Sequence, residues 1–353
     1  MLKEDIKKLL FDGTVIPAHP LALTRELQLD EHKQRGLTRY YMASGAGGVA
    51  VGVHTTQFEI RDPEVGLYEK VLEIAAEEIG TAALERPFIK VAGICGLTDQ
   101  ALNEARIAVK HGYDLGLVSM AAFKAQSEAE IIAHVTKVAQ VIPVFGFYLQ
   151  AAIGGRVYSY DFWQQFAEIP NVYAIKVAAF NRYQTLDVVR AVAHSGRRDE
   201  IALYTGNDDN IVADLLTPYR FEIQGQTIEK RFVGGLLGHW AVWTERAVAL
   251  FRNIKQTLAT GNPDMDSMLS TNIAVTDMNA AIFDPAHAFH GCITGVHEVL
   301  RRQGLMEGIW TLNPNETLSP GQYEEITRVI EAYPHLVDDA FVARFLEKEV
   351  NAI

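Results

Sequence analysis

The strongest constraint on the fold is an alternation, along the first 260 or so residues, of short apolar runs with segments of helical periodicity. The apolar runs are rich in β-branched and aromatic residues, as in buried parallel strands. A βα unit repeated eight times in about 250 residues indicates a closed βα barrel. The predicted strands are Gly13–Ala18, Gly48–Val53, Phe88–Ala92, Leu115–Ser119, Ile142–Tyr148, Val172–Val177, Ile201–Tyr204 and Phe232–Leu237. The predicted helices are Asp30–Ser44, Pro63–Ile79, Asp99–His111, Glu128–Val141, Tyr160–Glu168, Thr185–His194, Asn207–Leu216 and Trp240–Leu258.

A doubly wound open sheet is the alternative arrangement of repeated βα units. Its dinucleotide-binding form carries a G-x-G-x-x-G motif after the first strand, and this sequence has none there. The glycine-rich segment Gly45–Gly48 precedes a strand instead of opening a helix, so we interpret it as a turn. The predicted fold class is therefore α/β, a (β/α)8 TIM barrel with a small C-terminal helical domain.

The βα rhythm stops near Thr260, which divides the chain into a predicted barrel (residues 1–259) and a predicted helical cap (residues 260–353). One insertion, residues 217–230, separates the seventh helix from the eighth strand, and its β-like pattern around Gly225 predicts a hairpin. The helices predicted in the cap are Met268–Met278, Ala286–Gln303, Pro320–Ala332 and Asp338–Lys348.

Charge and composition limit the partners. A net charge of −12 and a pI near 5.4 argue against nucleic-acid binding, which requires a basic face. No apolar stretch is long enough to span a membrane, and the N-terminus lacks the apolar core of a signal peptide. Two cysteines, Cys95 and Cys292, cannot form a disulfide framework. We expect a cytoplasmic protein that binds a small molecule.

A lysine inside an apolar strand is the least expected residue of the sequence. Lys176 lies in the run Ala174–Ala178, where burial of an ammonium group is costly and favours the neutral, nucleophilic amine. A neutral amine attacks carbonyls and forms a Schiff base. Tyr148, at the end of the preceding predicted strand, could exchange protons with that centre. The alternative is that Lys176 extends past the barrel rim and pairs with a carboxylate.

Three histidines follow predicted strands that are neighbours in a closed barrel: His19, His54 and His239. Converging imidazoles with an open coordination position would suit a zinc-like ion, so a metal-dependent lyase or hydrolase is an alternative function. Asp208 and Asp209 could join such a site, but their position before a helix favours capping of its N-terminus.

The sequence resembles the dihydrodipicolinate synthase and N-acetylneuraminate lyase family over essentially its whole length. Tyr148 and Lys176 lie 28 residues apart, at the ends of consecutive predicted strands. The segment Ala174–Lys176 is similar to the family's G-I-K segment, Val51–Thr55 to its V-G-T-T-G-E loop and Leu203–Asp209 to its S-G-D-D segment.

The resemblance implies that Lys176 forms an imine with a 2-oxo acid such as pyruvate and that Tyr148 lies near that imine. It implies no cofactor, and it implies a homo-oligomer, a dimer or a tetramer. The residues expected to bind the substrate are Gly52, Val53, His54, Thr55, Thr205, Gly206 and Leu236.

The sequence also departs from the family's pattern. Val53 and His54 replace the two threonines of the carboxylate-binding loop, and the family's Y-N-x-P-x-R pattern becomes Tyr148–Ile153, without the arginine. An apolar residue cannot replace a bidentate carboxylate clamp. Our hypothesis is therefore an imine-forming lyase or aldolase acting on a 2-oxo acid or related carbonyl compound, and not a dihydrodipicolinate synthase. A ligand-binding protein without catalysis is a further alternative.

Overall fold

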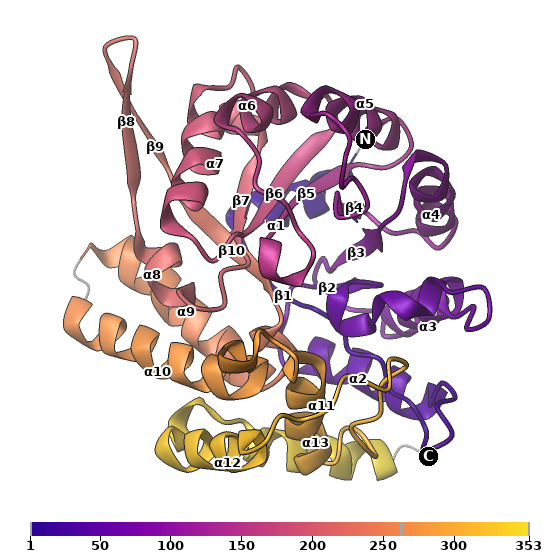
Figure 1. The fold of residues 1–353 in the computed structure, drawn as a ribbon. Coiled ribbons are helices and arrows are strands. Elements are labelled where there is room, and N and C mark those ends of the chain that lie inside the picture. The colour runs from indigo at the N-terminus through magenta and orange to yellow at the C-terminus, as the bar shows by residue number, and fades with distance from the viewer. Residues whose placement is uncertain (1, 262–263, 352–353) are drawn as a thin grey trace.

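A computed structural model describes residues 2–261 and 264–351, and eight parallel strands form its central sheet (Figure 1). The strands follow the order β1-β10-β7-β6-β5-β4-β3-β2. The ring closes where Ala18 pairs with Ala50 and the His19 amide donates to the Ala50 carbonyl at 2.8 Å. The strands are β1 (Val15–Pro17), β2 (Gly48–Val51), β3 (Ile89–Ile94), β4 (Leu115–Val118), β5 (Val144–Leu149), β6 (Val172–Ala178), β7 (Ala202–Thr205) and β10 (Phe232–Leu237).

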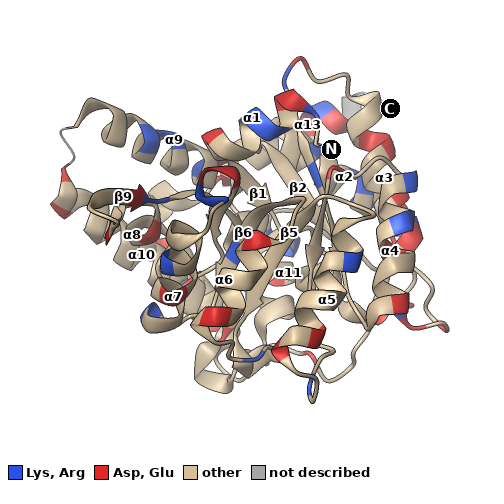
Figure 2. Ribbon diagram, turned by 90° about the horizontal axis from the view of Figure 1, so that it is seen from above, with Lys and Arg blue, Asp and Glu red and all other residues tan. Residues whose placement is uncertain are grey.

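Helices surround this barrel, and charged residues of both signs lie along them (Figure 2). Their order confirms the predicted βα rhythm and the TIM-barrel fold. A further helix, α1 (Glu4–Asp12), contacts β3 and β10, and its Leu10 carbonyl accepts a hydrogen bond from the buried Tyr204 hydroxyl. The surrounding helices are α2 (Glu31–Ala43), α3 (Tyr68–Thr81), α4 (Thr98–Lys110), α5 (Glu128–Ala139), α6 (Tyr160–Glu168), α7 (Arg182–His194), α8 (Ile211–Leu216) and α9 (Thr244–Thr260).

Two apolar cores lie on the two sides of the sheet, because successive residues of a strand point to opposite faces. Phe145, Phe147 and Leu149 of β5 belong to the core inside the barrel. Tyr148, between two of them, belongs to the core between the sheet and the helices. This alternation decides which side chains reach the space at the barrel's centre.

The insertion after α8 is the predicted hairpin: β8 (Tyr219–Ile223) pairs antiparallel with β9 (Gln226–Lys230) and projects from the barrel (Figure 1). In residues 264–351, four α-helices follow the barrel: α10 (Met265–Phe283), α11 (Cys292–Arg302), α12 (Gln322–Ala332) and α13 (Asp339–Asn351). The helix predicted from Ala286 begins instead at Cys292, since Pro285–His287 forms a short 3-10 turn.

Within the described ranges, no helix combines the length and apolarity needed to cross a membrane. The division into two domains, the homo-oligomeric assembly and the cytoplasmic location remain predictions.

Candidate active site

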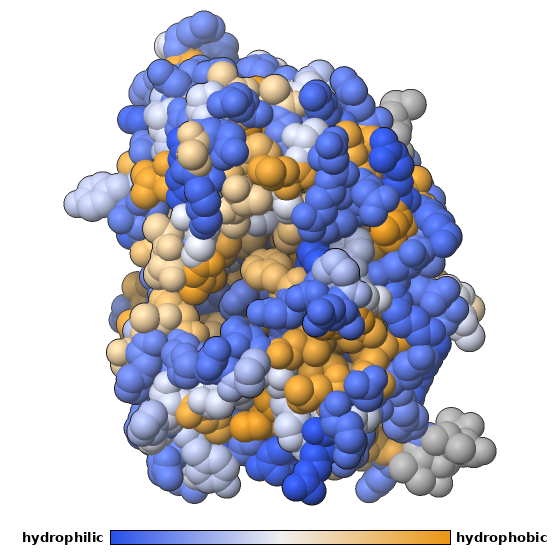
Figure 3. All heavy atoms as spheres, turned by 45° about the vertical axis from the view of Figure 1, so that its right-hand side comes forward, coloured by the Kyte–Doolittle hydropathy of each residue, from blue (hydrophilic) through white to orange (hydrophobic). Residues whose placement is uncertain are grey.

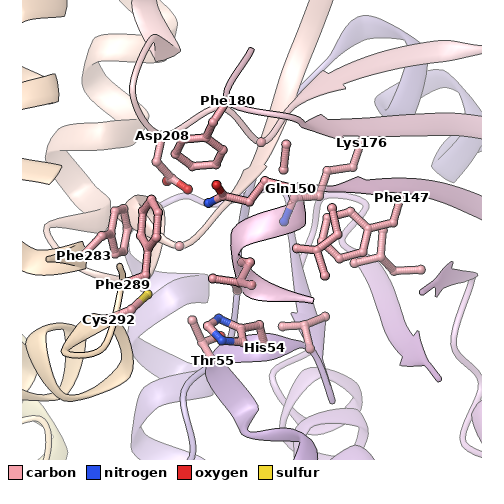
Figure 4. Close-up of a pocket in the computed structure, with 18 residues that line it drawn as sticks. His54, Thr55, Phe147, Gln150, Lys176, Phe180, Asp208, Phe283, Phe289 and Cys292 are labelled. Atoms are coloured by element: carbon pink, nitrogen blue, oxygen red, sulfur yellow. The ribbon is translucent and has the colours of Figure 1, made fainter. Parts of the chain in front are cut away.

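Lys176 extends from β6 into a pocket at the carboxyl ends of the strands, which is open to solvent and has about 650 Å³ of empty space (Figure 4). The residue is 9% exposed, and its Nζ lies 4.6 Å from the centroid of the Phe147 ring. Burial lowers the pKa of the amine to about 8, although the Asp208 carboxylate acts in the opposite direction. About a tenth of the amine is therefore neutral at pH 7, in the form that nucleophilic attack on a carbonyl requires.

Asp208 lines the same pocket and follows β7 in the chain. Its Oδ1 accepts a hydrogen bond from the His239 amide at 3.1 Å. Burial raises the pKa of this carboxyl group to about 7, while the charge of Lys176 acts to lower it. The interpretation of Asp208 as a helix cap is wrong, because Asn210 occupies the N-cap position of α8. Asp208 instead lines the pocket, where its charge acts on the Lys176 amine.

Tyr148 does not lie in the pocket, so the prediction that its phenol faces Lys176 is wrong. The register of β5 and β6 pairs Phe147 with Lys176 and Tyr148 with Val177. The Tyr148 ring therefore points outward and packs against Trp163 of α6, with centroids 5.0 Å apart. Phe147 occupies the inward position, and it has no ionisable group.

The loop after β2 presents three of its four predicted substrate-binding residues to the pocket, Val53, His54 and Thr55. Gly52 lies behind them with a φ of +75°, and its amide donates to Thr56 Oγ1 at 3.0 Å, so its prediction as a pocket residue is wrong. His54 begins a 3-10 turn, and the first N–H groups of a helical turn have no acceptor within it.

His54 is uncharged near neutral pH. Burial lowers the pKa of its imidazole to about 4, and the nearby charge of Lys176 lowers it further. A neutral imidazole can donate one hydrogen bond and accept another. His54 therefore faces the pocket as a hydrogen-bonding group and not as a cation.

The remaining predicted binding residues have different positions. Gly206 lines the pocket directly beneath Lys176, and a Cβ atom there would lie 2.5 Å from Lys176 Cε. Thr205 points away from the barrel centre and donates to Asp214 Oδ2 at 2.7 Å. Leu236 is fully buried in the interior core, outside the pocket lining. The predictions for Thr205 and Leu236 are wrong.

The predicted convergence of His19, His54 and His239 on a metal ion is also wrong. His19 is fully buried, and its ring nitrogens lie 2.8 Å from the Pro20 carbonyl and 2.9 Å from Thr38 Oγ1. His239 packs near Trp243. Across residues 2–261 and 264–351, no group of three or more His, Cys, Asp or Glu side chains is placed to hold a metal ion.

Most of the apolar lining was not predicted from the sequence. A phenylalanine close behind a strand, such as Phe180 two residues after β6, is a detectable signal because the loops there form the site. Residues of α10 and of the segment after it carry no such signal. The lining residues that were not predicted are Ala18, Leu117, Phe147, Leu149, Gln150, Ile153, Ala178, Phe180, Asp208, Gly238, Phe283, Phe289 and Cys292.

No protein-family model matches the sequence, and no curated protein matches it. Solved structures do match the fold. A dihydrodipicolinate synthase from Oceanobacillus iheyensis has a TM-score of 0.73 at 16% identity, with 94% of this chain and 99% of that chain covered. An N-acetylneuraminate lyase from Fusobacterium nucleatum has a TM-score of 0.70 at 16% identity, with 92% of this chain and 99% of that chain covered. The same lyase complexed with pyruvate has a TM-score of 0.69 at 17% identity, with 93% of this chain and 99% of that chain covered.

The pocket of Lys176 thus lies in a barrel that matches these enzymes over nearly its whole length. This chain shares the fold of the dihydrodipicolinate synthases and N-acetylneuraminate lyases.

Proposed function

We propose that this protein is an imine-forming lyase or aldolase that acts on a 2-oxo acid, or a related carbonyl compound, through Lys176. One observation carries the proposal: a buried lysine with a lowered pKa projects into a pocket at the carboxyl ends of the strands of a βα barrel. The fold similarity supports it, since one neighbour is a lyase whose structure contains pyruvate.

The proposed reaction begins when the Lys176 amine attacks the carbonyl carbon and water leaves, which gives an iminium ion. The iminium ion accepts the electron pair of a breaking bond at the neighbouring carbon. N–H groups at His54 and Thr55 would hold the substrate's carboxylate, since they open a 3-10 turn beside the amine.

Asp208 would move the protons that Tyr148 cannot reach. It is the other charged residue of the lining, and its raised pKa suits both acceptance and donation near neutral pH. His54 would serve as a neutral hydrogen-bond donor to the substrate.

Borohydride reduction in the presence of pyruvate tests the proposal, because it converts the imine to a stable amine. The expected result is a pyruvate-derived mass increase on the peptide that contains Lys176, and its loss in Lys176→Ala. Lys90→Ala is the matched control: burial also lowers the pKa of Lys90, but Lys90 does not line the pocket.

Absence of the adduct across a panel of 2-oxo acids would contradict the proposal. Thermal stabilisation by such an acid without adduct or turnover would support the alternative of a ligand-binding protein instead.

A further inference from the structure

Three phenylalanines lie across the pocket from Lys176: Phe180, after β6, and Phe283 and Phe289, at and beyond the end of α10 (Figure 4). The rings of Phe180 and Phe289 meet edge to face, with centroids 5.9 Å apart and an interplanar angle of 75°. Leu149 and Ile153 of the lining add aliphatic surface. We call the three phenylalanines the aromatic wall.

Two members of the aromatic wall are held in a costly backbone conformation. Phe180 has a φ of +50° and Phe289 a φ of +65°, in the left-handed region that residues other than glycine rarely adopt. The Phe180 amide donates to Asn207 Oδ1 and the Phe289 amide to the Asp284 carbonyl, both at 2.9 Å. Such strain persists only where the surrounding structure enforces it, and it concentrates at ligand sites.

The aromatic wall continues into a second hollow of about 330 Å³, which all three phenylalanines also line. Its polar lining residues are Asp208, Asp209, Thr276 and Asn279. Two of them form hydrogen bonds within the protein: Thr276 Oγ1 donates to the Asn272 carbonyl, and Asn279 Nδ2 donates to the Asp208 carbonyl. On the face shown in Figure 3, hydrophobic side chains border a central hollow.

The charge of the lining restricts what the aromatic wall can accept. In the described part of the chain, Lys176 and Asp208 are the charged residues that line the 650 Å³ pocket, and no arginine does. A second carboxylate or a chain of hydroxyl groups placed against the phenylalanine rings would lose its water and gain no hydrogen bond from the rings, since Gln150 and Asp208 are the polar side chains drawn beside them (Figure 4). A flat apolar group would instead gain buried area and edge-to-face contacts.

We infer that the aromatic wall binds an aryl group, so that the substrates are 4-aryl-4-hydroxy-2-oxobutanoates, which split into pyruvate and an aromatic aldehyde. This inference rests on the proposed imine chemistry. The carboxylate lies at the amides of His54 and Thr55, the C2 carbon at Lys176, the C4 hydroxyl group at Asp208, and the aryl group against the aromatic wall (Figure 4).

The reaction balances without a further reactant. Imine formation releases one water, and the C3–C4 bond then breaks as its electron pair moves to the iminium nitrogen. Asp208 takes the proton of the C4 hydroxyl group, so C4 leaves as the aldehyde. Asp208 returns the proton to C3 of the enamine, and one water hydrolyses the imine to pyruvate and free Lys176.

The test compares the kcat/KM of the intact protein for 4-hydroxy-2-oxo-4-phenylbutanoate and for 4,5,6-trihydroxy-2-oxohexanoate. We expect the phenyl compound to be favoured by about 100-fold or more, from burial of a phenyl ring and the unpaired hydroxyl groups of the competitor. A preference for the trihydroxy compound, with the Lys176 adduct intact, would overturn the inference and leave the proposed function standing.

Variants locate the preference in the structure. Phe289→Ala and Phe180→Leu should each reduce the ratio of kcat/KM for the phenyl compound to that for 4-hydroxy-2-oxopentanoate by about 10-fold or more. Tyr183→Ala is the control, because Tyr183 is 82% exposed and lies outside the pocket. Thermal melting checks that each variant folds, and an unchanged ratio in folded variants would overturn the inference.

If no adduct forms, the proposed function fails, and the aromatic wall is tested by binding alone. Lys176→Ala should then bind 4-phenyl-2-oxobutanoate at least about 10-fold more tightly than 2-oxobutanoate by calorimetry. Equal affinities would overturn the inference independently of the chemistry.

Discussion

At the scale of single residues, the pocket places two oppositely charged groups where burial disfavours both charges. Burial lowers the pKa of Lys176 and raises that of Asp208, and each charge partly offsets the effect of burial on the other. Neutral amine and protonated carboxyl group are therefore both accessible near neutral pH. An enzyme that forms an imine and then moves a proton needs these two states.

The pair of Lys176 and Asp208 predicts that imine formation and bond cleavage respond differently when Asp208 is replaced. In the wild type, the rate of pyruvate-adduct formation should rise with pH and level off above the Lys176 pKa of about 8. Asp208→Asn removes the carboxylate that raises this pKa, so the midpoint should move to lower pH. Turnover should fall by about 100-fold or more, since general acid–base catalysis is lost.

Trapping at a series of pH values, with turnover measured in parallel, checks this prediction. Asp209→Asn is the control, because Asp209 does not line the 650 Å³ pocket. Equal loss of adduct and turnover in Asp208→Asn would show that Asp208 does not act as the proton carrier.

Gly206 allows a steric test of the position of Lys176. In Gly206→Ala, the new Cβ would lie 2.5 Å from Lys176 Cε and 2.9 Å from Ala178 Cβ, so the lysine must move. We expect adduct formation to slow by about 10-fold or more, because small displacements of a reacting group cost this much. Gly36→Ala is the control, since a Cβ at Gly36 of α2 meets nothing within 4 Å. Normal adduct formation in a folded Gly206→Ala would contradict the described position of Lys176.

At the scale of elements, the positions of strands and helices could be predicted from the sequence. The side of a strand that each residue faces could be predicted less well. The β5 run is apolar or aromatic at every position, so periodicity does not distinguish Phe147 from Tyr148. The register with β6 supplies the answer, because it pairs Phe147 with Lys176. Thr205 was misplaced for the same reason: all four residues of β7 are buried.

The loop between β2 and α3 depends on a buried ion pair. Arg61 and Glu104 have side chains that are 9% and 4% exposed, with Nε 3.0 Å from Oε1. Arg61 Nη2 also donates to the carbonyls of Gly52 and Gly93, both at 2.9 Å, which ties the loop to β3. The loop carries His54 into the pocket, so this pair links stability to the shape of the proposed substrate site.

Arg61→Met should lower the free energy of unfolding by about 3–5 kcal/mol, because Glu104 is left buried without its cation. The KM for the 2-oxo acid should rise, since the loop loses its attachment. Arg220→Met is the control: Arg220 and its partner Glu229 are 61% and 37% exposed, and such pairs contribute about 0–1 kcal/mol. Urea denaturation of both variants measures the difference, and similar losses would contradict it.

At the scale of the whole molecule, segments far apart in the chain meet at one pocket. Lys176 and Phe180 come from β6 and the turn after it, whereas Phe283, Phe289 and Cys292 come from the end of α10, the segment after it and the start of α11. The barrel and the helices that follow it were predictable because each shows a local periodic pattern of apolar residues in the sequence. The aromatic wall was not, since nothing local to residues 283–292 indicates where α10 packs.

The hairpin β8–β9 is the part of the molecule that should be dispensable for the chemistry. None of its residues lines the pocket, and it projects from the barrel (Figure 1). Its strands end in a two-residue turn, Gln224–Gly225, flanked by the pair Ile223 and Gln226. Tyr219 and Lys230 form an equivalent pair at its base. Replacing residues 220–229 with Gln-Gly therefore joins this pair by the same two-residue turn.

We expect the shortened chain to form the pyruvate adduct at a rate within about twofold of wild type, because no residue near Lys176 changes. The free energy of unfolding should fall by about 1–2 kcal/mol, chiefly because the partly buried Phe221 loses its packing against the barrel core. Phe221→Ala in the full-length hairpin is the matched control and should show most of this loss. Loss of the adduct in a folded, shortened chain would mean that the hairpin acts on the pocket from a distance, for example through the predicted homo-oligomer, which sedimentation of both proteins would reveal.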